Sequence, residues 1–549
     1  MKCLRTRLFW MGTGLFRLRA RLRRTTIALA TVVSTVLLFW GAGLASQAAP
    51  FDIVLENARI IDGTGAPSRP GDIGIRDGRI ASIGRLAGQP AKERLNLGGL
   101  ALAPGFIDVH THADDVASKP LAENFIHMGV TSIVAGNCGS SALAVGDALA
   151  RIREATVAVN FATLVGHNTV RSSVMGSVER VPTLDELDRM KSLVFKAMAE
   201  GAVGFSTGLQ YVPGTYSKPN EILELARVAA NEGGIYATHM RNEGTALEDS
   251  IAESIRVARA LDMRLEISHL KVDSPNRWGA SAAALKLIDE ARAAGLKVQA
   301  DQYAYTAASS SLSIRFPSWA LEGGGERTRT RLQDEETWAK VKKDMQGLLA
   351  ERGFTDLSWA VVASYRADSS LNGLSMKQVA EKMIGNGSAD AQLEAARRMM
   401  IGGGASMVYH LMGDDDIARI MRHPMVSFAS DAGVLERGAG VPHPRGYGNA
   451  VRVLAEYVRE RKVITLEEAV RKMTSLPATH FGFANRGVIR EGAAADLVVF
   501  DPALVKDEAT YPAPHAFASG LPHVLVNGVF VVRDGKTTGA KPGQILRHK

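Results

Sequence analysis

Near both ends of the folded part of the chain, apolar and polar residues alternate in short runs. The runs lie within residues 51–103 and 487–536 and are separated by Asn-Gly and Asp-Gly pairs. Alternation with a period of two, interrupted by these turn dipeptides, is typical of β-hairpins. We expect the two β-rich ends to fold together as one small β-sandwich domain, with its first part at 49–104 and its second at 479–549.

Between these ends, eight short apolar runs alternate with amphipathic helical stretches. This alternation predicts a parallel β/α architecture, most simply a (β/α)8 TIM-like barrel spanning residues 105–478. The predicted strands are 105–112, 130–139, 160–168, 202–208, 234–240, 264–270, 296–305 and 425–433. Residues 309–424, between the seventh and eighth strands, have helical patterns of their own. We expect them to form an inserted helical segment.

The positive charge of the chain is concentrated at its amino terminus. The 549 residues include 65 Lys and Arg against 57 Asp and Glu, but residues 1–48 hold eight basic groups and no acidic one. The rest of the chain is therefore neutral. A nucleic-acid-binding protein needs its excess positive charge on the folded surface, so the charge pattern excludes that class.

The leader has the layout of an export signal. Basic residues up to Arg24 precede an apolar run at 27–44, and small residues follow, where cleavage after Ala48 is expected. We predict that residues 1–48 are a signal peptide and that the protein is periplasmic or secreted. The alternative is an uncleaved inner-membrane anchor, because the apolar run reaches the lower edge of membrane-spanning length. In that case the leader alone contacts the membrane.

The cysteine count is informative in an exported protein. The chain has two cysteines, and Cys3 lies in the leader, so the exported body keeps only Cys138. A lone thiol in an oxidising compartment is a liability unless something occupies it. Cys138 is therefore expected to be a ligand.

Side chains suited to metal binding close several of the predicted strands. His110 and His112 end the first strand, and because residues two apart on a strand point to the same face, both imidazoles face the barrel interior. Cys138 ends the second strand, His239 the fifth, His269 the sixth and Asp431 the eighth. Barrel active sites lie at the carboxyl ends of the strands, and this donor set suits Zn²⁺. His167, at the third strand end, is a further candidate to line the pocket, whereas His127 is expected to be structural.

Several motifs carry a resemblance to a known family. The segments, in chain order, are APGFIDVHTHADD, VAGNCG, STGLQYVPGTY, THMRNEG, ISHLK and SDAG followed by HPRGYG. Together they resemble the N-acyl-D-amino-acid deacylases (D-aminoacylases) of the amidohydrolase superfamily. The similarity extends from about Phe51 to the carboxyl end. Its most specific element is the cysteine of GNCG, since many amidohydrolases bridge their metals with a carboxylated lysine instead.

The resemblance implies a ligand set and an activity. A tightly bound zinc is expected on Cys138, His239 and His269. A second, weaker position is expected on His110, His112, Cys138 and Asp431. The implied activity is hydrolysis of the amide bond of an N-acyl-D-amino acid, a small-molecule substrate, to a carboxylate and a D-amino acid. Zinc lowers the pKa of bound water, and Asp431 is expected to serve as general base and acid.

The carboxylate of such a substrate needs cationic or hydroxyl partners. Lys271 is the first candidate, because it shares the strand face of His269; the alternative is a solvated charge at a strand end. Tyr211, Tyr305 and Arg445 are weaker candidates, and each has a structural role as its alternative. These four residues are the predicted substrate-binding set.

Two other functions are kept as alternatives. One is a cyclic amidohydrolase, similar to hydantoinases and dihydropyrimidinases, or a dipeptidase-like hydrolase. The other is a non-catalytic scaffold protein on a retained barrel. The sequence leaves open the preferred side chain and acyl group, the strictness of D-selectivity, the number of working metals and the oligomeric state.

Overall fold

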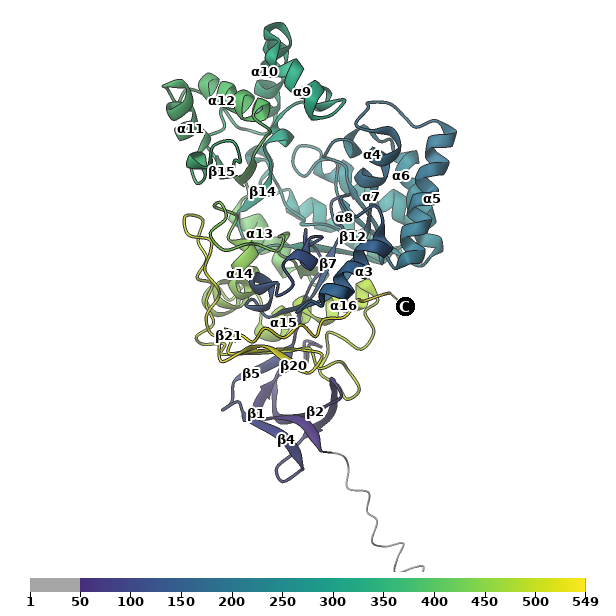
Figure 1. Ribbon diagram of the computed structural model, residues 1–549, viewed down its shortest axis with the longest axis vertical. Helices are drawn as coiled ribbons and strands as arrows, with labels where there is room; N and C mark the ends of the chain where they lie inside the picture. Colours follow the sequence, from purple (N-terminus) through teal and green to yellow (C-terminus); the bar gives the residue numbers. More distant parts are fainter. Residues whose placement is uncertain (1–49, 549) are drawn as a thin grey trace, which may run out of the picture. The chain divides into compact units, whose positions relative to one another are not determined.

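The computed structural model describes residues 50–548 (Figure 1). The predicted signal peptide or anchor at 1–48 lies outside the described residues. Among the residues described, no helix is long and apolar enough to cross a membrane.

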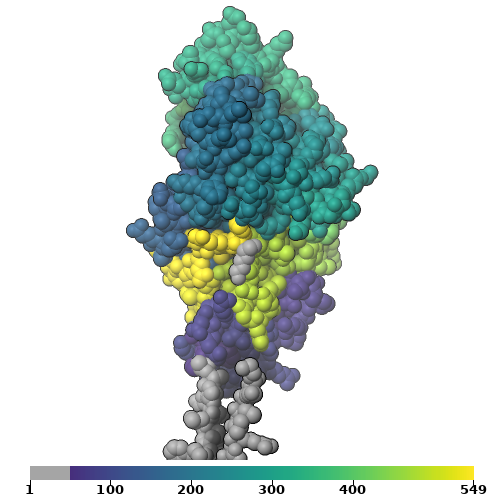
Figure 2. Space-filling view, turned by 90° about the vertical axis from the view of Figure 1, so that its right-hand side faces the viewer, coloured from purple at the N-terminus to yellow at the C-terminus, as the bar shows by residue number. Residues whose placement is uncertain are grey.

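The two ends of the described chain form one nine-stranded β-sheet. Its strands are β1 (Phe51–Ile60), β2 (Arg69–Arg76), β3 (Arg79–Gly84), β4 (Ala91–Asn96), β5 (Ala101–Pro104), β18 (Leu497–Phe500), β19 (His523–Val526), β20 (Val529–Arg533) and β21 (Lys536–Thr537). β5 pairs antiparallel with β18 and so joins the amino-terminal strands to the carboxyl-terminal ones. Figure 2 shows purple and yellow segments side by side in this part of the molecule. The prediction that both ends fold together as a β domain is confirmed.

Each of the eight predicted apolar runs contains a barrel strand. They are β6 (Phe106–Asp108), β7 (Val130–Ala135), β8 (Asn160–Thr163) with β9 (Val165–Gly166), β10 (Gly204–Gly208), β11 (Ile235–His239), β12 (Leu265–Ile267), β13 (Val298–Gln302) and β17 (Val426–Phe428). Neighbouring strands pair in parallel, in the orders β6-β7-β8 and β9-β10-β11-β12-β13-β17. A parallel bridge between Thr111 and Ala432 links the first strand to the last. The (β/α)8 barrel is confirmed.

Amphipathic helices surround the barrel strands. They are α2 (Glu123–Ile126), α3 (Val145–Ala155), α4 (His167–Met175), α5 (Leu184–Glu200), α6 (Pro219–Asn231), α7 (Leu247–Ala260), α8 (Ser281–Ala293), α13 (Asp414–Arg422), α14 (Arg445–Arg452) with a π-helical continuation (Val453–Glu460), α15 (Leu466–Met473) and α16 (Ser475–Phe481). α5 shows how the sequence starts such a helix. Thr183 and Glu186 form a reciprocal capping box at its amino end, which satisfies backbone donors that the helix leaves free.

The insertion between β13 and β17 contains helices α9 (Gly325–Gln333), α10 (Glu335–Glu351), α11 (Met376–Ile384) and α12 (Ala389–Ile401). It also contains an antiparallel sheet, in the order β14 (Ala307–Ser311), β16 (Ser406–His410) and β15 (Ala360–Ser364), which the sequence analysis did not predict. β14 reads AASSS and lacks the β-branched and aromatic residues that indicate strands. It becomes a strand because β16 pairs with it.

The barrel interior is closed by the carboxyl-terminal segment of the chain. Leu546 packs in a buried cluster with interior barrel residues such as Val134 and Ala162, and with Phe481 of α16. The backbone N–H of Phe161 donates to the carbonyl of Gln544 at 2.9 Å, so this segment lies along β8. The apolar interior is therefore filled, and the polar strand ends are left to build a site.

Candidate metal centre and substrate cavity

Three of the predicted ligands surround the sulfur atom of a fourth, Cys138. Cys138 Sγ lies 3.3 Å from His110 Nε2, 3.5 Å from His269 Nε2 and 3.7 Å from His239 Nδ1. The two last nitrogens are themselves only 2.8 Å apart. All four side chains are buried. Ring nitrogens at this separation, next to a sulfur, converge on a single point, which is the arrangement expected of ligands to one cation.

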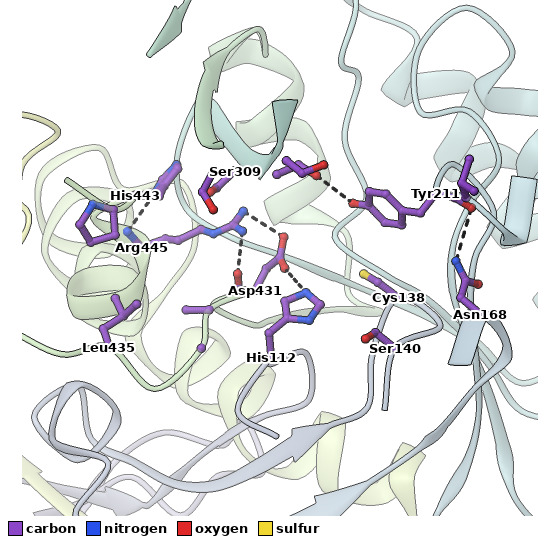
Figure 3. Close-up of a pocket in the computed structure, with 17 residues that line it drawn as sticks. His112, Cys138, Ser140, Asn168, Tyr211, Ser309, Asp431, Leu435, His443 and Arg445 are labelled. Atoms are coloured by element: carbon purple, nitrogen blue, oxygen red, sulfur yellow. Dashed lines mark hydrogen bonds and ion pairs between the residues drawn. The ribbon is translucent and has the colours of Figure 1, made fainter. Parts of the chain in front are cut away.

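The remaining two ligands form the open side of the same centre. Asp431 Oδ1 lies 3.1 Å from His112 Nε2 and 3.6 Å from His110 Nε2. Potential ligand atoms of His110, His112 and Cys138 lie within 4.8 Å of one another, as do those of His110, His269 and Asp431. Figure 3 shows His112, Cys138 and Asp431 pointing into a common space. The structure thus brings all six predicted ligands together.

Three of these ligands have unusual backbone conformations. Cys138, His269 and Asp431 adopt positive φ values of 52°, 35° and 51°. Side chains other than glycine reach this region only at a cost in energy, and such residues cluster at functional sites, where the surrounding structure enforces them. At each of these three strand ends the backbone turns sharply and directs the side chain inward.

The protonation states match a cation-binding site. Burial alone would raise the pKa of Cys138, but the neighbouring imidazoles, His110 above all, hold it well below its ordinary value. Burial would also raise the pKa of Asp431, yet Arg445 and the imidazoles hold it well below the usual range. A thiolate, a carboxylate and four imidazoles are the donor set that zinc prefers, so these residues fit the metal.

A second layer of polar groups orients the ligands. His269 Nδ1 lies 2.9 Å from Glu243 Oε1, and His239 Nε2 lies 2.8 Å from Gln210 Oε1. Asp301 accepts a hydrogen bond from the backbone N–H of His269 at 2.8 Å. Contacts of this kind select the tautomer that leaves the opposite ring nitrogen free for metal. The sequence analysis missed Glu243, Gln210 and Asp301, although Glu243 stands four residues after His239 within the motif THMRNEG.

Lys271 is anchored beneath the centre. Its Nζ lies 2.7 Å from Glu243 Oε1 and donates to the carbonyl oxygen of His269 at 3.1 Å. The residue is buried and contributes to the inner end of the cavity. Burial alone would lower the pKa of Lys271, but Glu243 raises it above the ordinary value, so the amine stays cationic. The alternative of a solvated surface charge is wrong.

Two other predicted substrate-binding residues also line the cavity. The hydroxyl of Tyr211 lies 3.2 Å from His239 Nδ1 and 3.4 Å from the hydroxyl of Ser310. The guanidinium of Arg445 lies 2.9 Å from Asp431 Oδ2. Both residues are labelled in Figure 3, on opposite sides of Asp431.

The structure places Tyr305 outside the substrate cavity, contrary to its prediction as a substrate-binding residue. Its hydroxyl donates to Asp507 Oδ2 at 2.8 Å, and the residue is absent from the lining of the cavity. The guanidinium of Arg452 stacks over its ring at 4.8 Å. Tyr305 therefore has structural partners, and Tyr303, two residues earlier, lines the inner cavity instead.

The two other histidines considered in the sequence analysis, His167 and His127, have structural roles. His167 is fully buried, lies 2.8 Å from Glu221, and does not line the cavity. Its neighbour Asn168 does line it and donates to the carbonyl of Gly208 at 3.0 Å. His127 stacks on Phe517 with ring centroids 4.1 Å apart, outside the site, as expected.

The centre opens into a cavity of about 560 Å³. Barrel loops contribute ligands His112, Cys138 and Asp431, and the insertion contributes the serines at 309–311 and Ser406. A volume of this size is typical of small-molecule sites and far exceeds the needs of a water molecule.

The inner end of the cavity contains two buried cations, beside the carboxylates of Glu243, Asp273 and Asp431. Besides Lys271 it includes Arg315, which comes from the insertion and is buried. The guanidinium of Arg315 stacks over the rings of Tyr409 at 4.4 Å and Trp359 at 5.1 Å, while its Nε has no hydrogen-bond partner in the described structure. A buried donor without a partner in the protein is available to an acceptor from a bound molecule, ion or water. Sequence reasoning missed Arg315, because nothing in the insertion's helical pattern marks it.

A (β/α)8 barrel whose strand ends hold thiolate, imidazole and carboxylate ligands around an open cavity is the scaffold of a metal-dependent hydrolase. Comparison with known proteins agrees. The chain belongs to the amidohydrolase family, whose model matches residues 93–532.

Individual relatives match along most of the chain. N-acyl-D-glutamate deacylase from Alcaligenes xylosoxydans xylosoxydans is 38% identical over 520 residues, which cover 90% of this chain and 96% of that protein. A solved structure of a D-aminoacylase with a binuclear metal centre superposes with a TM-score of 0.79 at 34% identity, covering 91% of this chain and 100% of that one. A further solved structure is N-acyl-D-glutamate deacylase from Bordetella bronchiseptica, with zinc and a phosphonate inhibitor that mimics the tetrahedral intermediate. It superposes with a TM-score of 0.78 at 35% sequence identity, covering 91% of this chain and 100% of that one.

Proposed function

We propose that the protein is a zinc-dependent hydrolase that cleaves N-acyl-D-amino acids to a carboxylate and a free D-amino acid. The observation that carries this proposal is the convergence of Cys138 with His110, His239 and His269 in a cavity that has cationic groups at its inner end. Relatives that match along nine-tenths of the chain are deacylases of this type. Cyclic amidohydrolase activity is not favoured, because those relatives act on linear amides. A scaffold function is not favoured either, because no ligand is missing.

The metal would be held by the two overlapping ligand groups. Cys138, His239 and His269 form one, and His110 and His112 join the shared Cys138 in the other. Asp431 completes the second group, since its Oδ1 lies 3.1 Å from His112 Nε2 and 3.6 Å from His110 Nε2. The D-aminoacylase of known structure has a binuclear centre with one-metal activation. We infer one tightly bound zinc and a second, weaker position. When bound, zinc lowers the pKa of a water molecule towards neutrality.

The side chains divide the proton and charge handling between them. Asp431, kept ionised by Arg445, accepts the proton of the attacking water and passes it to the nitrogen that leaves. The Tyr211 hydroxyl, directed at the metal centre, donates to the carbonyl oxygen as negative charge develops there. The C–N bond breaks, the water oxygen stays on the acyl carbon, and the amine takes the protons.

The inner end of the cavity favours an acidic amino acid. Lys271 is already paired with Glu243 at 2.7 Å, whereas Arg315 lines the same part of the cavity and forms no ion pair with any described residue. The Nε of Arg315 has no partner in the described structure and is available to an acceptor, and planar guanidinium groups pair especially well with carboxylates. We infer a preference for D-glutamate or D-aspartate over apolar D-residues.

The test is amine release by the zinc-loaded protein from paired N-acetyl-D- and N-acetyl-L-amino acids. Glutamate, aspartate, methionine and leucine would be compared. We expect turnover of D-enantiomers, with the acidic pair at least about 100-fold ahead in kcat/KM, since a buried cation left unpaired costs several kcal/mol. Absence of turnover for every D-substrate, with zinc bound, would contradict the proposal.

We also propose export, from the basic and apolar layout of residues 1–48. The test is fractionation of cells that express the full chain, followed by mass spectrometry of the amino terminus. A mature protein that starts at Ala49 outside the cytoplasm would support cleavage. An intact leader in the membrane fraction would support the anchor, and a full-length protein in the cytosol would contradict export.

A further inference from the structure

Strand β14 has one free edge. It is the first strand in the order β14-β16-β15, so only one of its sides is paired. The N–H of Leu312 donates to the carbonyl oxygen of Ala405 at 2.8 Å. This bond shows which residues of β14 turn their backbone groups towards β16. Hydrogen-bonded pairs alternate in an antiparallel ladder, so residues 308 and 310 face β16, and the backbone groups of Ser309 and Ser311 face the other side. The pairing of His410 agrees with this alternation. Its N–H points away from β14 and donates to the carbonyl oxygen of Trp359, next to β15, at 3.0 Å.

The free edge of β14 faces the substrate cavity. Three consecutive residues, 309–311, line it, which requires the strand to present its edge rather than one face. Ser309 and Ser310 also line the inner end beside His239 and His269. Both ends of this edge are partly occupied: the Ala307 carbonyl lies 2.9 Å from the His443 ring nitrogen, and the Ser311 carbonyl accepts a hydrogen bond from the Tyr409 hydroxyl at 2.9 Å. The groups left for a ligand are the N–H and C=O of Ser309 and the N–H of Ser311. In the described structure no strand covers the edge at Ser309.

The cavity continues beyond the metal centre along the same strand. Ser311 and Ser406 line both the cavity and an adjoining groove of about 590 Å³ in the insertion. The groove is further lined by the glycines at 402–404, by Ser364 and by Arg366. Arg366 is exposed and forms no ion pair with any residue described. The route from the metal outwards is therefore extended, lined in part by polar groups, and much larger than an acetyl group.

We propose that the acyl part of the natural substrate is a peptide, which pairs as an added strand with the free edge of β14. The enzyme would then release the carboxyl-terminal D-amino acid from peptides. This inference rests on the proposed function and specifies its substrate class. The balance is that of amide hydrolysis: one water adds across the last peptide bond, the oxygen joins the carbonyl carbon, and the terminal residue leaves as its free amine.

The lining offers hydrogen-bond partners to a peptide. Serine hydroxyls and glycine backbone lie along the groove, beside the apolar side chains of Leu312 and Met400. Edge strands recognise extended peptides through main-chain hydrogen bonds, without a strict demand on side chains. The free backbone groups of Ser309 and Ser311 extend over about 7 Å of β14, which suits pairing with about three residues of a peptide.

The first experiment compares substrates of increasing length. The terminal D-residue is the one preferred as its N-acetyl derivative, preceded by zero, one, two or three L-alanines with an acetyl cap. We expect kcat/KM to rise by about fivefold for each main-chain hydrogen bond gained, until the strand is filled. N-methylation of a peptide nitrogen that pairs with β14 should remove the increase in kcat/KM that its hydrogen bond provides. A flat length series with active N-acetyl substrate would overturn the peptide inference and leave the proposed function standing. Failure of every length would overturn the proposed function itself.

The second experiment removes one backbone donor from the edge. Ser311 has φ −75° and ψ 155°, values that proline adopts, so Ser311→Pro deletes the N–H that faces the groove while the strand keeps its shape. Ser311→Ala is the matched control, since it removes only the hydroxyl. The readout is the ratio of kcat/KM for the longest and the shortest substrate on the same variant, which cancels general damage. We expect Ser311→Pro to lower this ratio about fivefold and Ser311→Ala to keep it. Equal ratios in both variants would contradict pairing at this edge.

Discussion

Arg445 holds Asp431 by two contacts. One guanidinium nitrogen lies 2.9 Å from the Asp431 carboxylate, and another donates to the backbone carbonyl of the same residue at 2.6 Å. The guanidinium also stacks 4.5 Å above the ring of Tyr303. A carboxylate clamped through both its side chain and its backbone can neither rotate away nor protonate easily, which suits a group that must accept a proton and return it.

Replacing Arg445 by glutamine is therefore expected to impair catalysis in a pH-dependent way. Arg445 lowers the pKa of Asp431, so its loss raises that pKa, and activity, which needs the ionised carboxylate, disappears at a higher pH as the solution is acidified. We expect the acid limb of kcat/KM to move upward and the maximum to fall by about 100-fold. Arg437→Gln is the control, because Arg437 stacks on Phe517 and does not touch the centre. An unmoved acid limb in Arg445→Gln would contradict this role.

Cys138 is expected to be essential for metal retention. Its sulfur is the atom shared by both ligand groups, so Cys138→Ala removes a ligand from each. We expect the variant to lose stoichiometric zinc and all measurable turnover, as judged by metal analysis after dialysis. In the wild type, cobalt or cadmium substitution should produce a thiolate charge-transfer band that Cys138→Ala lacks. Ser140→Ala, at a neighbouring lining position, should retain zinc. Full zinc content in Cys138→Ala would refute the assignment.

Glu243 should matter for both stability and metal affinity. It is the anion shared by His269 and Lys271, and Glu243→Gln leaves the buried lysine without a counter-charge. We expect a loss of about 3–5 kcal/mol in the free energy of unfolding and a 10–100-fold weaker zinc affinity. The double variant with Lys271→Met should regain stability but not zinc affinity. If Glu243→Gln binds zinc as tightly as the wild type, the orienting role is wrong.

Arg315 is expected to determine side-chain preference. Arg315→Leu removes the buried cation and leaves an apolar surface beside Tyr409 and Trp359. We expect kcat/KM for N-acetyl-D-glutamate to fall by about 100-fold while that for N-acetyl-D-leucine rises, so that the ratio of the two reverses. Arg315→Lys, which keeps the charge, should retain part of the preference for glutamate. An unchanged ratio in Arg315→Leu would show that another group reads the side chain.

Lys472 lies away from the active site, and we expect it to make the free energy of unfolding depend on pH. It is fully buried, and burial lowers its pKa to about 7 from an unfolded value of 10.5. Between these values the unfolded chain binds more protons, so this residue's contribution to the free energy of unfolding rises with pH from about 7 to 10.5. Urea unfolding of the wild type and Lys472→Met across this window should show the difference between them growing in favour of the wild type. A difference independent of pH would contradict the lowered pKa.

Much of the fold and of the metal centre followed from the sequence alone. Period-two alternation and strand–helix alternation are local signals, and they predicted the β domain and the eight barrel strands. Parallel barrel strands bring their carboxyl ends to one rim whatever their separation in the chain. His110, Cys138, His239 and Asp431 therefore had to meet once each was placed at a strand end.

Only the tertiary structure decided what surrounds those ligands. Lys271 and Tyr305 are both polar residues near strand ends, yet one meets Glu243 beneath the centre and the other meets Asp507 outside the cavity. Arg315 and the edge of β14 reach the site because the insertion packs over the barrel rim. Such contacts depend on how segments distant in sequence pack together, and neither periodicity nor spacing encodes that packing.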